Sequence, residues 1–344
     1  MSPTSYRCST SRYNKFEKSE RTAAAFVSVA GCKYTTVEHF FQTIFNGLNL
    51  PTIYFNVKAG FVNIFGNPNA GKSTLLNALM GEKLAIVSSK VQTTRHRIKG
   101  FLTTDDYQII FSDTPGIIEP KYKLHERMMG AVKSSLEDAD VAVLLVDIHD
   151  NWEECNAIFS SLRLRVHSIV VLNKIDKADA EKLNAAKAFF KKRPYCKKLV
   201  TISALGHKHL DELLVTIVDM LPEGDPFYAE DEMTDLSERF FVGEMVREKI
   251  FEYFQDEIPY HTTVAVHEFK QKSSLIKIGA NIIVQRETQK SIIIGEGGKM
   301  IKKIGSEARK DIEKFLGQKI FLELFVKVRP NWRKNDLFLK EYGY

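Results

Sequence analysis

The spacing of apolar residues divides the chain into two parts with different patterns. From residue 58 to residue 222, short and mostly apolar runs alternate with segments in which apolar residues recur every three or four positions. Uninterrupted runs are typical of strands that are buried on both faces of a parallel sheet. Runs that approach this pattern, with polar residues only singly within them or at their ends, occupy residues 59–65, 107–112, 141–148, 168–173 and 198–203. The pattern therefore predicts an α/β domain with a doubly wound, mostly parallel sheet and ligands at the carboxyl ends of its strands.

Segments with helical periodicity fill the intervals between these strands. They cover residues 73–81, 125–139, 153–163, 179–192 and 209–221. Residues 101–113 instead indicate a hairpin with Asp105 and Asp106 in the turn, which places one antiparallel strand at the edge of the sheet.

A second pattern follows the break at residues 222–226, where two prolines and a glycine end the last helix. We interpret residues 223–236 as a linker and residues 237–344 as a second domain with a C-terminal tail. Its first helix is indicated by apolar residues close to helical spacing, namely Phe241, Met245, Ile250 and Phe254. Two strand-like stretches, two helices and a last strand follow, so the order α-β-β-α-α-β predicts a small α+β domain.

Composition narrows the class of protein. Hydrophobic residues make up 44% and charged residues 27% of the 344 residues, as in ordinary globular proteins. No uninterrupted apolar run reaches the length of a membrane-spanning helix. The four cysteines form no C-x-x-C pair, which argues against a zinc site or a disulfide framework and fits a reducing compartment.

The net charge of +6 is unevenly distributed along the chain. Residues 270–340 hold 17 Lys and Arg against 7 Asp and Glu, whereas residues 228–268 hold 3 against 11. A basic block beside an acidic one indicates a polyanionic partner for the basic part, and a solvated charged surface is the alternative.

The sequence GNPNAGKS, residues 66–73, joins the first predicted strand to the first predicted helix. In that context G-x-x-x-x-G-K-[ST] is a phosphate-binding loop. Its glycines allow a tight turn that points backbone N–H groups at one spot, Lys72 adds a full charge, and Ser73 offers a hydroxyl to Mg²⁺. The residues expected at the phosphates are Gly66, Asn67, Asn69, Ala70, Gly71, Lys72, Ser73 and Thr74.

Three further stretches follow later strands in the order that a GTP-binding domain requires. Asp113, which begins DTPG, can hold Mg²⁺ through water, and the Gly116 N–H can reach a γ-phosphate. The carboxylate of Asp176, in NKID, can accept hydrogen bonds from guanine N1–H and the 2-amino group; adenine lacks both donors, so ATP is rejected. A backbone N–H of the Ser-Ala pair can meet guanine O6. The further residues expected at the nucleotide site are Asp113, Thr114, Pro115, Gly116, Asn173, Lys174, Asp176, Ser203 and Ala204.

The expected metal site combines Ser73 and Asp113 with a hydroxyl from residues 91–97, VQTTRHR. A threonine in this loop completes the coordination of Mg²⁺ only when a γ-phosphate is present, so the loop orders with GTP and loosens after hydrolysis. Thr94 is the first choice and Thr93 the second; the arginines of the loop face either RNA or the second domain. The groups expected to act on the reacting phosphate are Lys72, Thr94 and Gly116.

The second domain carries GEGG at residues 295–298, between an apolar stretch and KMIKKIG. Two glycines at this spacing between two helices let a nucleic-acid backbone approach closely, as in the GXXG loop of a KH domain. The residues expected to bind RNA are Gly295, Glu296, Gly297, Gly298, Lys299, Lys302 and Lys303. A glycine-rich helix end without a ligand is the alternative.

Together, GNPNAGKS, QTTRHRI, SDTPG, NKID, ISA, IIGEGGKMIKKIG and the closing VKVRPNWRKN resemble the Era family of bacterial GTPases over residues 58–344. The resemblance implies a P-loop GTPase domain at residues 58–222, a type II KH domain after it, GTP or GDP with Mg²⁺ as ligands, and RNA binding coupled to the GTP state. It further implies binding to the 3′ end of 16S rRNA and to the 30S subunit during small-subunit assembly. A monomer in the cytoplasm with peripheral contact to the inner membrane, and without DNA as a partner, is expected.

Two positions depart from what is usual in comparable GTPases. Ala70 stands where the Era family more often has Val. Ile117 follows DTPG, where Ras-type GTPases have a glutamine that orients water; an apolar side chain cannot do this, so slow intrinsic hydrolysis is expected. Related GTPases with P-N-x-G-K imply that Asn69 helps to hold K⁺ at the phosphates.

Residues 1–57 have no counterpart in this resemblance. We expect an N-terminal extension that is disordered, or a translation start misassigned upstream of Val57, or a presequence that would direct the protein to the mitochondrial matrix. The alternative function is a membrane-associated signalling GTPase whose basic C-terminal domain binds anionic lipid. The GXXG loop argues against it, because lipid needs charge but no close approach of the backbone.

Overall fold

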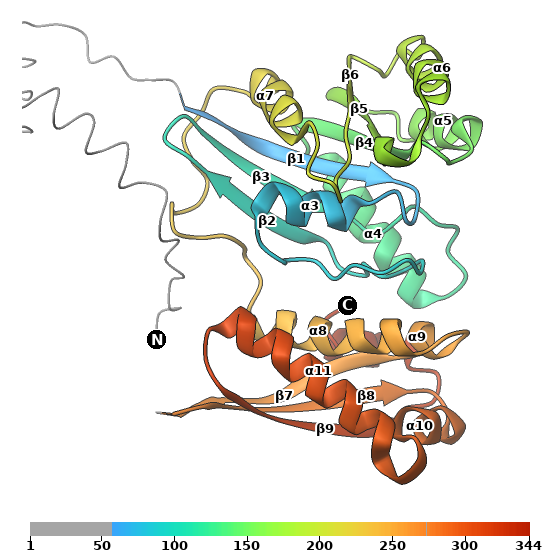
Figure 1. Ribbon diagram of the computed structural model, residues 1–344, viewed down its shortest axis with the longest axis vertical. Coiled ribbons are helices and arrows are strands. Elements are labelled where there is room, and N and C mark those ends of the chain that lie inside the picture. The colour runs from blue at the N-terminus through green and yellow to red at the C-terminus, as the bar shows by residue number, and fades with distance from the viewer. Residues whose placement is uncertain (1–56, 273) are drawn as a thin grey trace, which may run out of the picture.

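The computed structural model describes residues 57–272 and 274–344, and the expectations for the N-terminal segment lie outside the described residues. The chain forms two layered domains that are stacked on one another (Figure 1). Within the described residues no helix combines the length and apolar character needed to cross a bilayer.

The first domain is built on a six-stranded sheet of order β2-β3-β1-β4-β5-β6. β2 is antiparallel to β3, as the predicted hairpin requires, and the other neighbouring pairs are parallel. This confirms the predicted mostly parallel sheet. The strands are β1 (Lys58–Gly66), β2 (Ile98–Thr103), β3 (Tyr107–Asp113), β4 (Val141–Asp147), β5 (His167–Asn173) and β6 (Lys198–Thr201).

Helices cover both faces of this sheet. Apolar side chains of α3 and α7 pack with Val62 and Ile64 of β1 on one face, and those of α4, α5 and α6 pack with Phe65 on the other. Alternate residues of one strand therefore serve two cores, as an uninterrupted apolar run demands. The helices are α3 (Lys72–Met80), α4 (Lys123–Glu137), α5 (Trp152–Ser161), α6 (Ala180–Lys191) and α7 (Leu210–Met220).

The second domain has one sheet of order β7-β8-β9, in which β7 and β8 are antiparallel and β8 and β9 parallel. Its core joins β8 to α8, α10 and α11. The predicted α-β-β-α-α-β order is confirmed for the longer elements, and the short helices α9 and α12 are additional. The elements are α8 (Glu238–Tyr253), α9 (Ile258–His261), β7 (Thr263–Gln271), β8 (Ile276–Val284), α10 (Glu287–Ile294), η2 (Glu296–Gly298), α11 (Lys299–Leu316), β9 (Ile320–Val328), η3 (Trp332–Lys334) and α12 (Asp336–Glu341).

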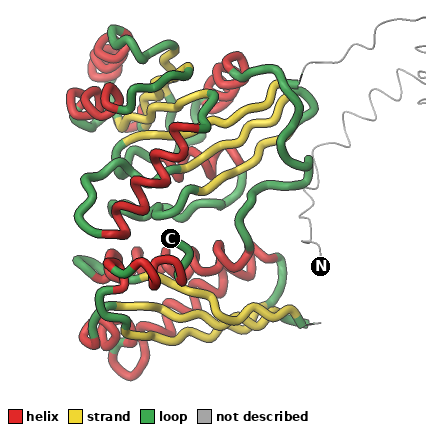
Figure 2. The backbone as a smooth tube through the Cα atoms, turned by 180° about the vertical axis from the view of Figure 1, so that it is seen from behind, coloured by secondary structure: helices red, strands yellow, loops and turns green. Residues whose placement is uncertain are grey.

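Two details differ from the sequence-based expectation. Phe254 does not extend the first helix of this domain, because α8 ends at Tyr253 and Phe254 caps it in an extended conformation. The segment expected as a tail is structured: Trp332 and Leu339 are fully buried and pack with Leu124 and Met128 of α4. Figures 1 and 2 both place the C-terminus between the two domains.

Candidate functional site: a guanine-nucleotide and magnesium site with a separate RNA-binding loop

The phosphate-binding loop connects β1 to α3, and its lysine side chain is hydrogen-bonded to the backbone of the same loop. Lys72, the first residue of α3, donates from Nζ to the carbonyl oxygens of Gly66 at 3.0 Å and Asn67 at 2.8 Å. Burial lowers the pKa of Lys72 to about 8, although the carboxylates of Asp113 and Asp150 act in the opposite direction. A bound phosphate group would add negative charge beside the Lys72 ammonium and raise its pKa again.

Glycine is required at two points of this loop because neighbours approach closely. A Cβ at Gly66 would lie 2.4 Å from the Leu145 carbonyl oxygen, and one at Gly71, which has φ +100°, would lie 2.4 Å from Asn173 Nδ2. Asn69 also has positive φ, and its side chain donates to the Ser89 carbonyl at 2.8 Å. Its role in holding K⁺ stays a prediction.

Three oxygens expected at Mg²⁺ meet at the carboxyl edge of the sheet. Ser73 Oγ lies 2.8 Å from Thr94 Oγ1 and donates to Asp113 Oδ2 at 2.6 Å, while Thr94 Oγ1 lies 3.2 Å from the same carboxylate oxygen. Two adjacent ligands of an octahedral Mg²⁺ with bonds of 2.0–2.1 Å are separated by about 2.9 Å. The Ser73–Thr94 separation therefore fits a shared magnesium ion.

The surroundings of the Asp113 carboxylate also fit a bound magnesium ion. Its Oδ1 is buried without a hydrogen-bond partner within the described residues. Burial raises the pKa of this carboxyl group, with Lys72, Ser73 and Thr94 opposing the shift. A buried carboxylate in this state is expected beside a cation or its bound water. Thr93 does not join the cluster, since its hydroxyl donates to the Lys90 carbonyl at 2.6 Å.

The DTPG segment lies against the phosphate loop. Thr114 Oγ1 donates to the Ile64 carbonyl at 2.8 Å, and Pro115 is buried. A Cβ on Gly116 would lie 2.9 Å from the Pro68 side chain and 3.0 Å from its backbone. The two loops are thus close enough for their N–H groups to serve one ligand.

Residues of the predicted guanine site are joined to the phosphate loop by side-chain hydrogen bonds. Asn173, at the end of β5, donates to the Ala70 carbonyl at 2.9 Å and accepts from the Ala204 N–H at 3.0 Å. Lys174 donates to the Asn69 carbonyl at 2.9 Å and to Asp147 at 2.6 Å. The three loops that would enclose a nucleotide therefore form one connected unit.

Asp176 and Ser203 complete this side of the site. Ser203 Oγ donates to Asp176 Oδ1 at 2.5 Å, and this hydrogen bond lowers the pKa of the exposed Asp176 carboxyl group. A carboxylate held in its charged form suits the two donors of guanine. Thr74 lies in the first turn of α3, next to Ser73.

Asp147 is a supporting residue that the sequence motifs do not include. It ends β4 at the carboxyl edge of the sheet and fixes the Lys174 side chain. A signal for it is present in the sequence, because an aspartate lies near the carboxyl end of the most uniformly apolar of the predicted strands, where ligands are expected.

The predicted RNA-binding loop lies in the second domain, between α10 and α11. Gly297 and Gly298 have φ of +57° and +76°, and a Cβ at either would meet no atom within 4 Å. The backbone here is open to a ligand. Gly295 has less space around it, since a Cβ there would lie 2.7 Å from the Met300 Cβ.

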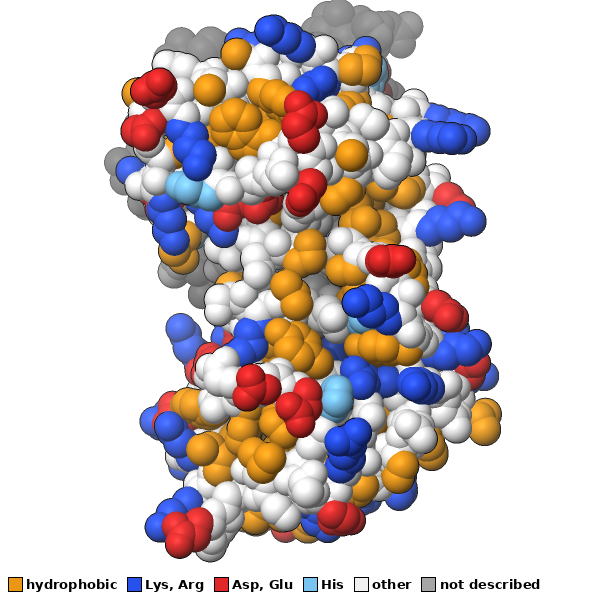
Figure 3. Space-filling view, turned by 90° about the vertical axis from the view of Figure 1, so that its right-hand side faces the viewer, with side chains coloured by type: hydrophobic (Ala, Val, Ile, Leu, Met, Phe, Trp, Pro, Cys, Tyr) orange, Lys and Arg blue, Asp and Glu red, His pale blue; other side chains and the backbone are white. Residues whose placement is uncertain are grey.

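Cations flank this loop on the exposed surface. Lys299 begins α11 and lies 3.6 Å from the Glu296 carboxylate, Lys302 is exposed, and Lys303 Nζ lies 4.1 Å from the centre of the Tyr253 ring. Figure 3 views the side of the molecule where α10 lies and shows Lys and Arg side chains on both domains across this face.

Comparison with known families agrees with a nucleotide site in the first domain and an RNA-binding loop in the second. Residues 61–174 match the family described as 50S ribosome-binding GTPase, and residues 257–333 match the KH domain. The chain is 42% identical over 291 residues to proteins named GTPase Era from Alkaliphilus metalliredigens and from a Thermoanaerobacter species. The matches span 83% of this chain and 99% and 96% of those proteins, respectively.

Two crystal structures are similar to this fold over 84% of the chain and 99% of theirs, each with a TM-score of 0.81 and 42% identity. One is Era in complex with MgGDPNP and nucleotides 1506–1542 of 16S ribosomal RNA. The other is a variant of Era from Aquifex aeolicus bound to GDP and AlF₄⁻.

Proposed function

This chain belongs to the Era family of GTPases, and on that premise we propose that it is a GTP-dependent RNA-binding switch in the assembly of the small ribosomal subunit. It is a Mg²⁺-dependent enzyme that hydrolyses GTP, and its C-terminal domain is an RNA-binding KH domain. In the proposed cycle, GTP orders residues 91–97 and the DTPG segment, the KH domain holds the 3′ region of 16S rRNA, and hydrolysis releases it.

The observation that carries this proposal is the pairing, in one chain, of a connected nucleotide site with an open GXXG loop. The related Era structure holds a GTP analogue and 16S rRNA at the same time. That pairing supports a partner in the 3′ region of 16S rRNA and in the 30S subunit, rather than an anionic lipid surface.

The residues of this site have distinct parts in GTP hydrolysis. Ser73 and Thr94 would hold Mg²⁺ directly and Asp113 through water, and the ion would neutralise charge on the phosphate oxygens. Lys72 and the Gly116 N–H stabilise charge that develops on the transferring phosphoryl group. Ile117 packs among apolar side chains and offers no group to orient water, so we expect slow turnover without a partner.

The proposal extends to the cellular setting. The described cysteines, Cys155 and Cys196, are free thiols, which agrees with a reducing compartment. We place the protein in the cytoplasm, as a monomer that binds no DNA and contacts the inner membrane peripherally; the mitochondrial matrix is the alternative location.

An RNA-binding measurement tests this function. A Gly297→Asp variant adds a negative charge at the open loop, so affinity for a single-stranded oligonucleotide of the 16S rRNA 3′ region should fall about tenfold or more, as when one charged contact is lost. The measurement is fluorescence anisotropy in the presence of Mg²⁺ and a GTP analogue.

Gly317→Asp is the matched control. Gly317 also has positive φ, and a Cβ there would meet no atom within 4 Å, but it caps the far end of α11. Its substitution should leave the affinity unchanged. Equal effects of the two variants, or equal binding to a shuffled sequence, would contradict the proposal.

A further inference from the structure

One face of α8 in the KH domain lies against the GTPase domain. The residues that share this face follow one another at spacings of three and four positions, and they are Glu244, Arg247, Glu248 and Phe251. Glu248 accepts hydrogen bonds from Lys83 Nζ at 2.6 Å and from the Val87 N–H at 3.1 Å. A charged helix face is therefore occupied by the GTPase domain.

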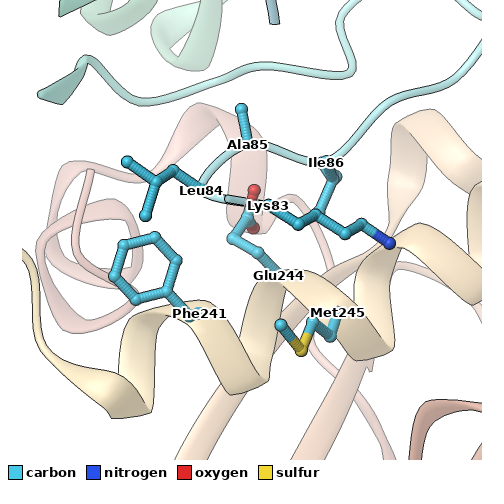
Figure 4. A pocket seen from close by; sticks show the side chains of 7 residues that line it. All are labelled: Lys83, Leu84, Ala85, Ile86, Phe241, Glu244 and Met245. Atoms are coloured by element: carbon cyan, nitrogen blue, oxygen red, sulfur yellow. The ribbon is translucent and has the colours of Figure 1, made fainter. Parts of the chain in front are cut away.

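The same contact encloses a small cavity between the domains. Residues 83–86 of the GTPase domain line it from one side, and Phe241, Glu244 and Met245 of α8 line it from the other (Figure 4). The two chain segments thus pack directly on each other beside the loop that carries Thr94.

Arg247 is fully buried in this interface. Its Nε donates to Glu244 Oε1 at 2.7 Å, and its Nη2 donates both to Glu244 and to the backbone carbonyl of Thr93. Burial alone would lower the pKa of Arg247, but the Glu244 carboxylate raises it, so the guanidinium stays charged. A KH-domain cation therefore holds the backbone beside the expected magnesium ligand.

Arg95 makes the reciprocal contact on the other side of Thr94. It is 2% exposed and reaches from the GTPase domain to the carbonyl oxygens of Thr262 at 2.7 Å and Pro259 at 2.9 Å. Thr94 thus lies between two residues that are each hydrogen-bonded to the KH domain, while its own hydroxyl lies 2.8 Å from Ser73 Oγ.

We infer that Arg247 is a positioning residue of the GTP site: it fixes the Thr93 carbonyl and thereby holds Thr94 where Mg²⁺ and a γ-phosphate require it. The KH domain then contributes to GTP binding through this residue. A hydroxyl from this loop is needed only when a γ-phosphate is present, so Arg247 should matter for GTP and not for GDP.

A purely structural role makes a different prediction. Buried ion pairs are often no more stabilising than apolar side chains of the same volume, and a pair that only held the domains together would affect both nucleotides equally. Selectivity between GTP and GDP therefore separates the two roles. The inference extends the proposed switch by naming the contact through which RNA and nucleotide would be coupled.

The test compares nucleotide affinities of the full chain and two variants without RNA. Arg247→Lys keeps the charge beside Glu244 but loses the planar fork that reaches both partners. The double variant Glu244→Gln with Arg247→Gln removes the pair without leaving an unpaired buried charge. In both, affinity for a nonhydrolysable GTP analogue should fall about tenfold, as expected for one charged hydrogen bond.

Two readouts and one control variant decide the result. GDP affinity should stay within about twofold, because the loop does not bind the metal in that state. The Mg²⁺ concentration needed for half-maximal binding of the GTP analogue should rise. Arg239→Lys, on the same helix but with its guanidinium over the Phe269 ring, should behave like the unchanged chain.

Equal losses for GDP and the analogue, or no loss for either, would overturn the inference. Since no RNA is present in this test, such a result would leave the RNA-binding proposal standing. Conversely, failure of the Gly297→Asp experiment would not affect this nucleotide selectivity.

Discussion

At the residue scale, we expect recognition of the guanine base to depend on the carboxylate of Asp176. Asp176 is exposed at the rim of the nucleotide site and is held by the hydroxyl of Ser203 at 2.5 Å. Because the hydrogen bond favours the ionised form, the group stays an acceptor over the neutral pH range. Guanine offers two donors at this point and adenine offers none.

We expect Asp176→Asn to exchange the preferred base. The amide presents a donor where guanine presents its 2-amino donor, so GTP affinity should fall roughly 10²-fold or more through loss of two charge-assisted hydrogen bonds. Xanthosine triphosphate, with a carbonyl at that position, should bind more tightly to the variant than to the unchanged chain. Competition binding with GTP and xanthosine triphosphate measures both changes.

Asp179→Asn is the control for this change. Asp179 lies three residues later and caps α6 by accepting from the Lys182 N–H at 2.7 Å, a role that asparagine fills equally well. Retained preference for GTP in the Asp176 variant would show that the base is selected elsewhere.

At the scale of elements, the loop of residues 91–97 connects the expected magnesium site with the interface between the domains. His96 follows Arg95 and is enclosed by Phe240 of α8, at 5.2 Å between ring centres, and by Tyr344, at 4.4 Å. Burial lowers the pKa of His96 to about 4, with the charges of Arg247 and Arg95 acting in the same direction and Glu244 against them. The interface therefore holds a neutral histidine.

This arrangement makes stability depend on pH. An unfolded histidine titrates near pH 6.5, so the folded state binds fewer protons than the unfolded state between pH 6.5 and 4, and stability falls as pH decreases through that range. For His96 alone the loss should reach about 2 kcal/mol by pH 5. Urea unfolding at pH 7 and pH 5 measures it.

Replacing His96 with Phe keeps an aromatic ring and removes the titration, so His96→Phe should lose less stability between the two pH values. His125 and His261 also have a pKa lowered to about 4 by burial and should leave a residual slope. An identical pH dependence for His96→Phe would contradict this account of the interface.

At the scale of the whole molecule, the features that could be predicted from sequence are those formed by residues that are close together in the chain. The strand, glycine turn and helix around Lys72 are adjacent in the chain, and so are the helices around Gly297, so both loops could be predicted from the sequence. Sequence could not separate Thr93 from Thr94, because the difference is which neighbouring side chain turns toward Ser73. Nor could it show whether Arg95 faces RNA or the second domain.

The unpredicted parts depend on contacts between distant segments. The acidic and basic residues of α8 indicate a solvated helix, yet Arg247 and Glu248 are buried because residues some 160 positions earlier cover them. Trp332 lies in a polar stretch and is fully buried because α4 packs over it. Neither burial has a local signal, since the partner surfaces come from another domain.

At the scale of the whole molecule, we expect these contacts between the two domains to couple nucleotide state to RNA affinity. The most direct test measures the affinity of the unchanged full chain for the 16S rRNA 3′ oligonucleotide with Mg²⁺ and a GTP analogue, and again with Mg²⁺ and GDP. Couplings between sites typically lie between about 5-fold and 150-fold, and we expect tighter RNA binding with the GTP analogue by at least about fivefold. Equal affinities in the two nucleotide states would contradict the account.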